Sequence, residues 1–177
     1  MRRVLVVVTG PLLQVLEDRV LRLIGWSGLE LYLLHIIDTQ PLAGFSLASG
    51  ALPGRAEQAH ARLREMRKAT EAAGQRLLEE AEALARSILP EGLPVLRLQR
   101  EGVPGNEIVA AARDVGADLV VLDAEPHYPG PLSGAAPRLP GPPARHPPGP
   151  PPRRPSPTVH FVVDHAPCDV LLVYGRP

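Results

Sequence analysis

The stretch REGVPGNEIVAAARDVGADLVVLDA, residues 100–124, decides the fold class of this chain. Its first half predicts a helix, because Pro104 suits a first helical position and Gly116 suits the position just after a helix. The apolar residues of this helix are Ile108, Ala111, Ala112 and Val115. Residues 118–124 then form an apolar run without polar alternation, typical of a strand covered on both faces. A helix followed by such a strand is the repeating unit of a parallel α/β sheet.

The same alternation extends over most of the chain. Further strands are expected at 4–8, 29–37, 93–99 and 169–175. Helices are expected at 11–24 and at 57–89, the second being long, alanine-rich and covered with charges. Strands that alternate with helices imply right-handed crossovers. We therefore expect a doubly wound α/β fold with a five-stranded parallel sheet and helices on both faces.

Composition limits the class of protein. With 177 residues, 45% of them hydrophobic, a single domain over 1–177 can bury a core. The 19 basic and 19 acidic side chains cancel, so we expect no binding to nucleic acid. The apolar run at 4–8 is shorter than a signal peptide needs, and no run approaches the roughly 18 apolar residues of a membrane span. We expect a cytoplasmic protein without membrane insertion.

Residues 126–157 differ from the rest of the chain. This tract holds 14 of the 22 prolines, with four glycines, four arginines and no acid. Such a composition buries too little apolar surface to offset the entropy lost on ordering, so we expect a disordered or polyproline loop. A changed reading frame in a GC-rich gene is an alternative origin for the tract.

Three segments resemble the universal stress protein family. They are LELYLLHIID (29–38), the opening stretch (100–124) and VHFVVDHAPCDVLLVYG (159–175). The last is the most specific, because members of that family typically end in His-Ala-Pro-Cys-Pro-Val-Leu-Val-Val and this chain departs only at Asp169 and Leu172. The resemblance covers 1–124 and 158–175. It implies an adenine nucleotide alpha hydrolase-like fold with flavodoxin-like layering, and a proline-rich loop inserted after the fourth strand.

The resemblance also implies where a nucleotide would bind and that this site has changed. Family members that bind ATP end the first strand in aspartate, where this chain has Thr9. They carry two glycines after the fourth strand, where this chain has Pro126 and Pro129, and a later Gly-Ser pair that is missing near Ser156. The candidate ligand pocket, at the carboxyl ends of the strands, is expected to include Thr9, Gly10, Ile37, Asp38, Leu122, Asp123, Pro126 and Pro129.

Proline at the two motif positions weakens any phosphate site, because proline has no backbone N–H to donate. A hydrogen bond to a charged group contributes about 1.5 to 3 kcal/mol, so two lost donors weaken binding by roughly two to four powers of ten. Asp123 and Glu125 would add repulsion toward phosphates. We expect a degenerate nucleotide site with no cofactor. In the alternative, ATP binds through a remodelled phosphate loop that carries Arg138, Arg145, Arg153 and Arg154.

Other patterns suggest sites more weakly. His165 and Cys168 could form a nucleophilic pair, but the resemblance implies that they only link the last helix to the last strand. Asp38, Asp123 and Glu125 could gather around a divalent cation, although solvated loops are the simpler interpretation. We therefore expect no catalytic residue and no metal. RHPPGPPPR (145–153) matches an SH3-type ligand, with a featureless linker as the alternative.

The last strand predicts the quaternary structure. A long apolar edge strand aggregates unless it is paired, and the resemblance implies pairing with a second copy. The expected dimer edge consists of Val170, Leu171, Leu172, Val173 and Tyr174. Together these patterns favour a non-enzymatic stress-response or regulatory protein that acts as a homodimer and binds an unknown protein partner.

Overall fold

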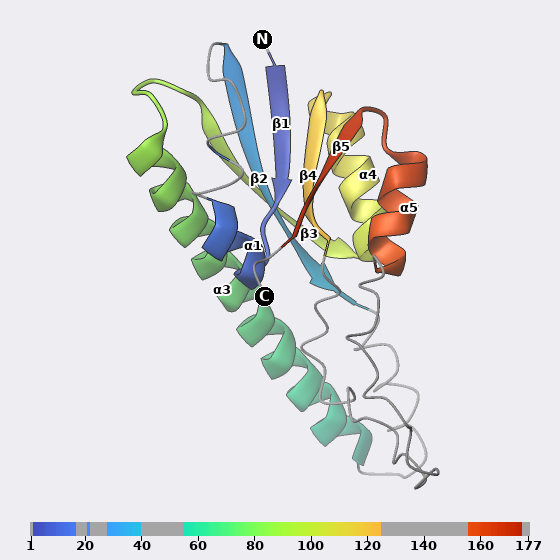
Figure 1. Cartoon of the computed structure of the whole chain (residues 1–177). Coiled ribbons are helices and arrows are strands. Elements are labelled where there is room, and N and C mark those ends of the chain that lie inside the picture. The colour runs from blue at the N-terminus through green and yellow to red at the C-terminus, as the bar shows by residue number, and fades with distance from the viewer. Residues whose placement is uncertain (1, 17–20, 22–27, 40–54, 125–155, 175–177) are drawn as a thin grey trace, which may run out of the picture.

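The computed structural model describes residues 2–16, 21, 28–39, 55–124 and 156–174 (Figure 1). The strands are β1 (Arg2–Val7), β2 (Leu29–Asp38), β3 (Val95–Gly102), β4 (Leu119–Asp123) and β5 (Asp169–Val173). The helices are α1 (Gly10–Val15), α3 (Arg55–Ile88), α4 (Pro104–Val115) and α5 (Pro157–His165). All neighbouring strands are parallel, in the order β3-β2-β1-β4-β5. The predicted α/β class and five-stranded parallel sheet are therefore confirmed.

The sheet separates two hydrophobic clusters, one beneath each pair of helices. On one face α1 and α3 pack over Val4, Val6, Leu31, Leu33 and Val121. On the other, α4 and α5 pack over Leu5, Val7, Leu34, Val120 and Leu122. Successive residues of β1 thus alternate between the two clusters, as a strand covered on both faces requires. The strand order runs outward from β1 to β3 on one side and from β4 to β5 on the other, so the pair β1 and β4 is the switch point of the sheet.

Several element boundaries differ from the sequence prediction, most of them by one or two residues. β3 ends at Gly102, three residues later than expected, because the whole of Val95–Gly102 pairs with the longer strand β2. β3 is an outer strand, so it can carry polar side chains that reach solvent. These residues interrupt the apolar pattern, and the end of the strand could not be recognised from it. The helix expected at 11–24 is described as α1 only over Gly10–Val15, and residues 17–20 and 22–27 lie outside the described part.

Helix α3 is longer than the sheet that it covers. Its 34 residues span about 50 Å at about 1.5 Å per residue, and its N-terminal half extends past the sheet (Figure 1). The apolar side chains of α3 are therefore buried only toward its C-terminus, and Met66 is 53% exposed. Where α3 reaches the sheet, Gly74 lies so close to His35 that a Cβ on it would come within 2.4 Å of the imidazole.

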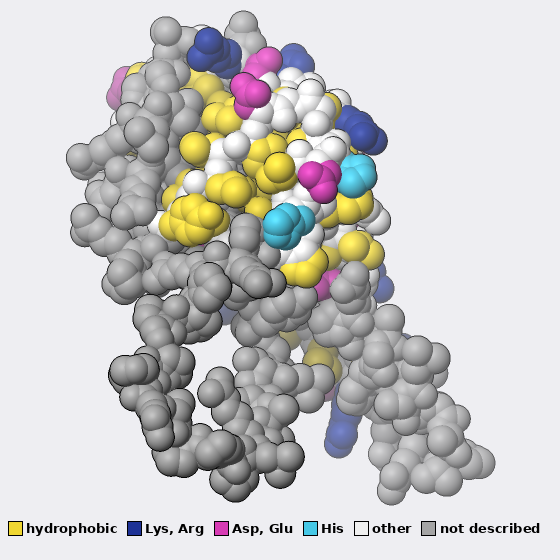
Figure 2. Space-filling model, turned by 45° about the vertical axis from the view of Figure 1, so that its right-hand side comes forward, with side chains coloured by type: hydrophobic (Ala, Val, Ile, Leu, Met, Phe, Trp, Pro, Cys, Tyr) yellow, Lys and Arg dark blue, Asp and Glu magenta, His cyan; other side chains and the backbone are white. Residues whose placement is uncertain are grey.

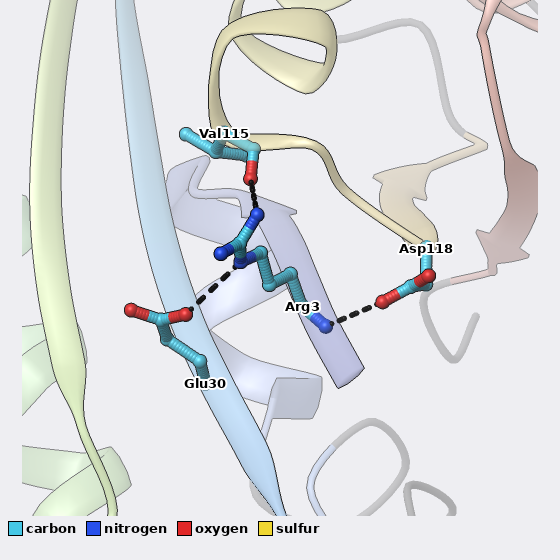
Figure 3. A network of polar contacts seen from close by, with 4 residues as sticks. All are labelled: Arg3, Glu30, Val115 and Asp118. Atoms are coloured by element: carbon cyan, nitrogen blue, oxygen red, sulfur yellow. Dashed lines mark hydrogen bonds and ion pairs between the residues drawn. The ribbon is translucent and has the colours of Figure 1, made fainter. Parts of the chain in front are cut away.

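The amino-terminal ends of three strands are joined by Arg3 (Figure 3). Its Nε donates to Glu30 of β2 and its guanidinium donates to the carbonyl of Val115 at the end of α4. The backbone N–H of Arg3 donates to the Asp118 carboxylate, and the N–H of Asp118 donates back to the Arg3 carbonyl. This edge of the sheet is thus fixed by structural contacts, and a ligand site is to be sought at the opposite edge.

Candidate functional site

The candidate site lies at the carboxyl edge of the sheet, where strands β1 to β5 end and helices α1, α4 and α5 begin (Figure 1). Ligands of doubly wound folds bind at this edge, close to the switch point. Helix N-termini offer backbone N–H groups, which are the donors that a phosphate needs. A phosphate could bind here only if the backbone N–H groups at the starts of α1, α4 and α5 are free to donate.

Two of the three helices are capped by their own side chains. Thr9 Oγ1 accepts a hydrogen bond from the N–H of Leu12 at 3.2 Å, at the start of α1. Ser156 Oγ accepts from the N–H of Val159 at 3.2 Å, at the start of α5. Both helices also carry proline in the first two positions, which removes a further donor. Each first turn therefore presents fewer free amides than an uncapped helix would.

The third helix, α4, begins beneath a carboxylate. A Cβ on Gly102, the last residue of β3, would lie 2.8 Å from Glu107 Oε1, so the Glu107 side chain folds over this turn. Arg100 lies 3.8 Å from the same carboxylate group. Gly102 has φ of +155°, a conformation that L side chains rarely adopt, so glycine suits this position for the backbone as well. An acid in the first turn stabilises the helix and repels an incoming phosphate.

The predicted pocket residues divide into two groups by burial. Thr9, Asp38 and Asp123 are partly exposed at the ends of their strands, and Gly10 is exposed. Ile37 is 5% exposed and Leu122 is 3% exposed, so both belong to the packed interior. Pro126 and Pro129 lie outside the described residues.

The strand register keeps Asp38 and Asp123 apart. Val6 pairs with Leu33 on β2 and with Val121 on β4, so those two residues lie at one level. Asp38 lies five residues beyond that level and Asp123 only two, an offset of about 10 Å at about 3.3 Å per residue. The strands are also separated by β1, which adds about 10 Å sideways. The two carboxylates therefore cannot chelate one cation, and no cluster of three metal-ligating residues occurs within the described ranges.

His165 and Cys168 lie at the opposite edge of the sheet, where α5 leads into β5. The ring of His165 stacks on Phe161 with centroids 4.2 Å apart, and its Nδ1–H donates to the Phe161 carbonyl at 2.9 Å. Cys168 packs against the core beneath α4 and α5. Burial, followed by the nearby charges of Asp169 and Asp118, raises the pKa of the Cys168 thiol. A raised pKa disfavours the thiolate, which is the nucleophilic form.

The residues of the predicted dimer edge alternate between the two faces of the sheet. Val170 and Leu172 pack against the cluster beneath α4 and α5, whereas Leu171 packs against the opposite cluster. Val173 is already 6% exposed in the single chain, while Tyr174, just beyond the strand, is 43% exposed. Along β5 the inner edge pairs with β4, and no other described strand pairs with it.

The description "Universal stress protein family" belongs to a family model that matches residues 1–130. The chain belongs to this family. The match covers β1 to β4 and therefore most of the sheet described above. No curated protein matches this universal stress protein.

Three similar solved structures share its fold. The hypothetical protein MJ0577 is 16% identical with a TM-score of 0.60, covering 99% of this chain and 97% of its own. UspA from Lactobacillus plantarum is 17% identical with a TM-score of 0.56, covering 97% of each chain. A universal stress protein from Arabidopsis thaliana, solved with AMP bound, is 18% identical with a TM-score of 0.53, covering 99% and 93%. Some structural relatives thus bind nucleotides.

Sequence reasoning missed the caps and the acid that occupy the helix starts. Thr9 and Ser156 each stand before a proline-containing first turn, which is a recognisable start signal. Glu107 falls in the first turn of α4, but only the structure shows that its side chain folds back over Gly102.

In addition, no helix within the described residues is long and apolar enough to cross a membrane.

Proposed function

We propose that this universal stress protein is a non-enzymatic stress-response or regulatory protein of the cytoplasm. It acts as a homodimer and by binding a protein partner, and its nucleotide site is degenerate. The carboxyl edge carries this proposal. Thr9 and Ser156 occupy donors that a phosphate would use, and Glu107 places a carboxylate over the third helix start. The sequence supports the same conclusion, because prolines replace the two motif glycines at 126 and 129.

The size of the effect supports weak or absent binding of ATP. Each hydrogen bond to a charged group contributes about 1.5 to 3 kcal/mol, so four lost donors remove about 6 to 12 kcal/mol of binding free energy. That loss is comparable to the whole binding free energy of a micromolar ligand, about 8 kcal/mol. The aspartate that would hold the adenosine end of ATP is also replaced. Thr9 stands at its position, just after β1. The hydroxyl of Thr9 accepts from its own helix.

A thermal titration tests the proposal. The purified full chain is heated with and without millimolar Mg·ATP, and its melting temperature is recorded. Any ligand that favours the folded state must raise that temperature. We expect no shift beyond that produced by magnesium and sodium sulfate at the same ionic strength. A saturable rise of several degrees with ATP alone would contradict the degenerate site.

A second candidate function is nucleotide binding through a remodelled loop. The AMP-bound relative from Arabidopsis thaliana favours it, because its fold is similar over 99% of this chain. In this alternative the arginines of the proline-rich tract replace the glycine amides. Replacing Arg138, Arg145, Arg153 and Arg154 by glutamine together separates the two functions. A nucleotide-induced shift that disappears in that variant would establish the alternative.

The homodimer is proposed on the character of β5. The strand contains four consecutive apolar residues, Val170–Val173, and only its inner edge is paired among the described strands. Figure 2, turned so that the side carrying α5 and β5 comes forward, shows hydrophobic side chains gathered on this face. An apolar edge strand is a template for pairing with another chain. Pairing of two copies of β5 across a two-fold axis would remove that hazard.

A further inference from the structure

Helix α3 carries a stripe of exposed residues on a side turned away from the sheet. Gly74 marks the direction of the sheet, because it faces His35 of β2. The stripe lies about 120° round the helix from that direction, at about 100° per residue. Its members recur at alternating spacings of four and three, as on a helix face that packs against another helix. They are all exposed: Arg62, Met66, Ala69, Ala73, Arg76 and Glu80.

This α3 stripe has no partner within the part of the chain that the structure describes. Elsewhere, α3 pairs its charges with β3. Within the stripe, Arg62, Arg76 and Glu80 form no ion pair with any described residue. Met66 is 53% exposed, although it is a large apolar side chain. The stripe is therefore an unpartnered face on a helix whose opposite side is packed.

The charges of α3 change sign along the helix. Residues 61–70 carry four cations and one acid, a formal charge of +3. Residues 71–82 carry one cation and four acids, a formal charge of −3. Two copies of such a helix attract each other when they run antiparallel, because the basic part of each then lies beside the acidic part of the other. Parallel copies would bring like charges together.

The α3 stripe is also symmetric about residue 71. In a two-fold contact, residue i of one copy meets residue j of the other, and residue j meets residue i. The pairs around residue 71 are Arg62 with Glu80, Met66 with Arg76, and Ala69 with Ala73. The first pair joins opposite charges, and the second lays a thioether on the aliphatic stem of an arginine. The third consists of small side chains, which allow two helices to approach to about 8 Å.

We propose that two copies of this chain associate through antiparallel pairing of their α3 helices along the α3 stripe. The contact is separate from the β5 edge, so it goes beyond the proposed homodimer and does not depend on it. The paired stretch, residues 62–80, is about 27 Å long, and a helix about 10 Å across then covers roughly 270 Å² on each copy. A stable interface buries about 800 Å² on each partner, so this contact is weak and depends on concentration.

Charge reversal tests the register of the contact. Arg62→Glu places an acid against Glu80 of the second copy, and the two-fold symmetry repeats this at the other end of the stripe. We expect the dissociation constant of the α3 contact, measured by sedimentation velocity at low ionic strength, to rise at least about tenfold. The double variant Arg62→Glu with Glu80→Arg restores the opposite charges, so its dissociation constant should return to within about threefold of the wild type.

Arg113→Glu on α4 is the matched control, because it changes the net charge equally at an exposed position off the stripe. We expect it to leave the dissociation constant unchanged. Equal effects of Arg62→Glu and Arg113→Glu, or a double variant that stays as weak as Arg62→Glu, would overturn the register.

Cross-linking separates antiparallel from parallel pairing. Single cysteines are placed in a Cys168→Ser background, and the protein is treated with a bismaleimide whose arm spans about 8 Å, the spacing of two packed helices. Around residue 71, the two copies of Ala69→Cys lie about 6 Å apart along the helices, and those of Arg62→Cys about 27 Å apart. We expect a covalent dimer from Ala69→Cys only. A covalent dimer from Arg62→Cys, or none from Ala69→Cys, would contradict antiparallel pairing.

A variant of the other contact distinguishes this inference from the proposed homodimer. Self-association that survives Leu171→Lys on β5 but weakens with Arg62→Glu would support the α3 contact and contradict the β5 dimer. Self-association that is lost with Leu171→Lys and unchanged by Arg62→Glu would overturn the α3 contact and leave the β5 dimer standing. A chain that stays monomeric at every accessible concentration would overturn both.

Discussion

The two outer strands of the sheet, β3 and β5, meet solvent in opposite ways. β3 carries three charged residues, and each pairs with a covering helix: Arg97 with Glu82 of α3, Arg100 with Asp114 of α4, and Glu101 with Arg67 of α3. β5 has no charge between Val170 and Val173 and ends beside the exposed Tyr174.

The difference indicates which side of the molecule is built for contact. Natural proteins protect edge strands with charged side chains and with covering elements, and β3 has both. β5 has no charged side chain along its apolar run, Val170–Val173. Since surface ion pairs contribute only about 0 to 1 kcal/mol each, the charges on β3 matter less for stability than for preventing a second chain from pairing there. Among the described residues, charged side chains thus line the β3 margin of the sheet and are missing from the apolar run of β5.

The largest effect is expected from placing a charge on β5. Leu171→Lys puts an ammonium group on a strand whose partner would be an identical strand, and edge lysines prevent such pairing. Because Leu171 also packs against the cluster beneath α1 and α3, circular dichroism checks that the variant still folds. We expect the dimer dissociation constant to rise by at least about 30-fold, as for the loss of an interface hot spot. Size-exclusion chromatography with light scattering measures this change.

The matched control is Leu96→Lys on β3, where the leucine is 39% exposed. Because β3 is already protected, the oligomeric state should not change. If both lysine variants dissociate alike, or if neither does, the contrast between the two edges is wrong.

A smaller effect, on the stability of the fold, is expected where α3 packs against β2 and β3. Gly74→Ala gains helix propensity, but its Cβ would meet His35 at 2.4 Å and Gln99 at 2.7 Å. Overpacking typically costs about 1 to 3 kcal/mol, which exceeds the gain of about 1 kcal/mol from replacing glycine. We expect a lower free energy of unfolding in urea.

The double variant Gly74→Ala with His35→Ala is the control, because it removes the imidazole that the new methyl group meets. Its loss of stability should be less than the sum of the two single losses. Additive losses would show that the contact does not limit the packing of α3.

The smallest effect concerns Cys168, the residue directly before β5. Burial and the charges of Asp169 and Asp118 raise the pKa of its thiol, so the folded chain holds this proton to higher pH than the unfolded chain does. The resulting stability is present below the unfolded pKa and is lost as pH rises through the higher folded value. At pH 8 we expect iodoacetamide to modify the folded protein more slowly than the same protein in urea. Equal rates would contradict the raised pKa.

Much of the fold could be predicted from the sequence, because strands covered on both faces appear as continuous apolar runs. The runs that became β1 and β4 are continuous in apolar residues, and Pro104 and Gly116 mark the ends of α4 as predicted. β3 was misplaced because an outer strand can be charged and still pair. The close packing at Gly74 could not be predicted, because the sequence shows only a lone glycine in an alanine-rich helix. Glycine suits this position because the imidazole of His35, on a strand distant in sequence, leaves no room for a Cβ.

The candidate site was predictable in position but not in detail. The carboxyl edge follows from the strand order, and a loss of amide donors follows from prolines in the sequence. The sequence marks Thr9 and Ser156 as possible helix caps, each before a proline-containing first turn, but only the structure shows that their hydroxyls accept the amide hydrogen bonds. The separation of Asp38 from Asp123 depends on register, which only the paired strands reveal.

Backbone hydrogen exchange of the two outer strands tests the central claim most directly. The outward amides of β5 and β3 are compared by NMR or mass spectrometry at protein concentrations below and above the dimer dissociation constant. We predict that the outward amides of β5 become protected as the dimer forms, while those of β3 exchange equally fast throughout. Protection that is the same on both strands at every concentration would contradict pairing through β5.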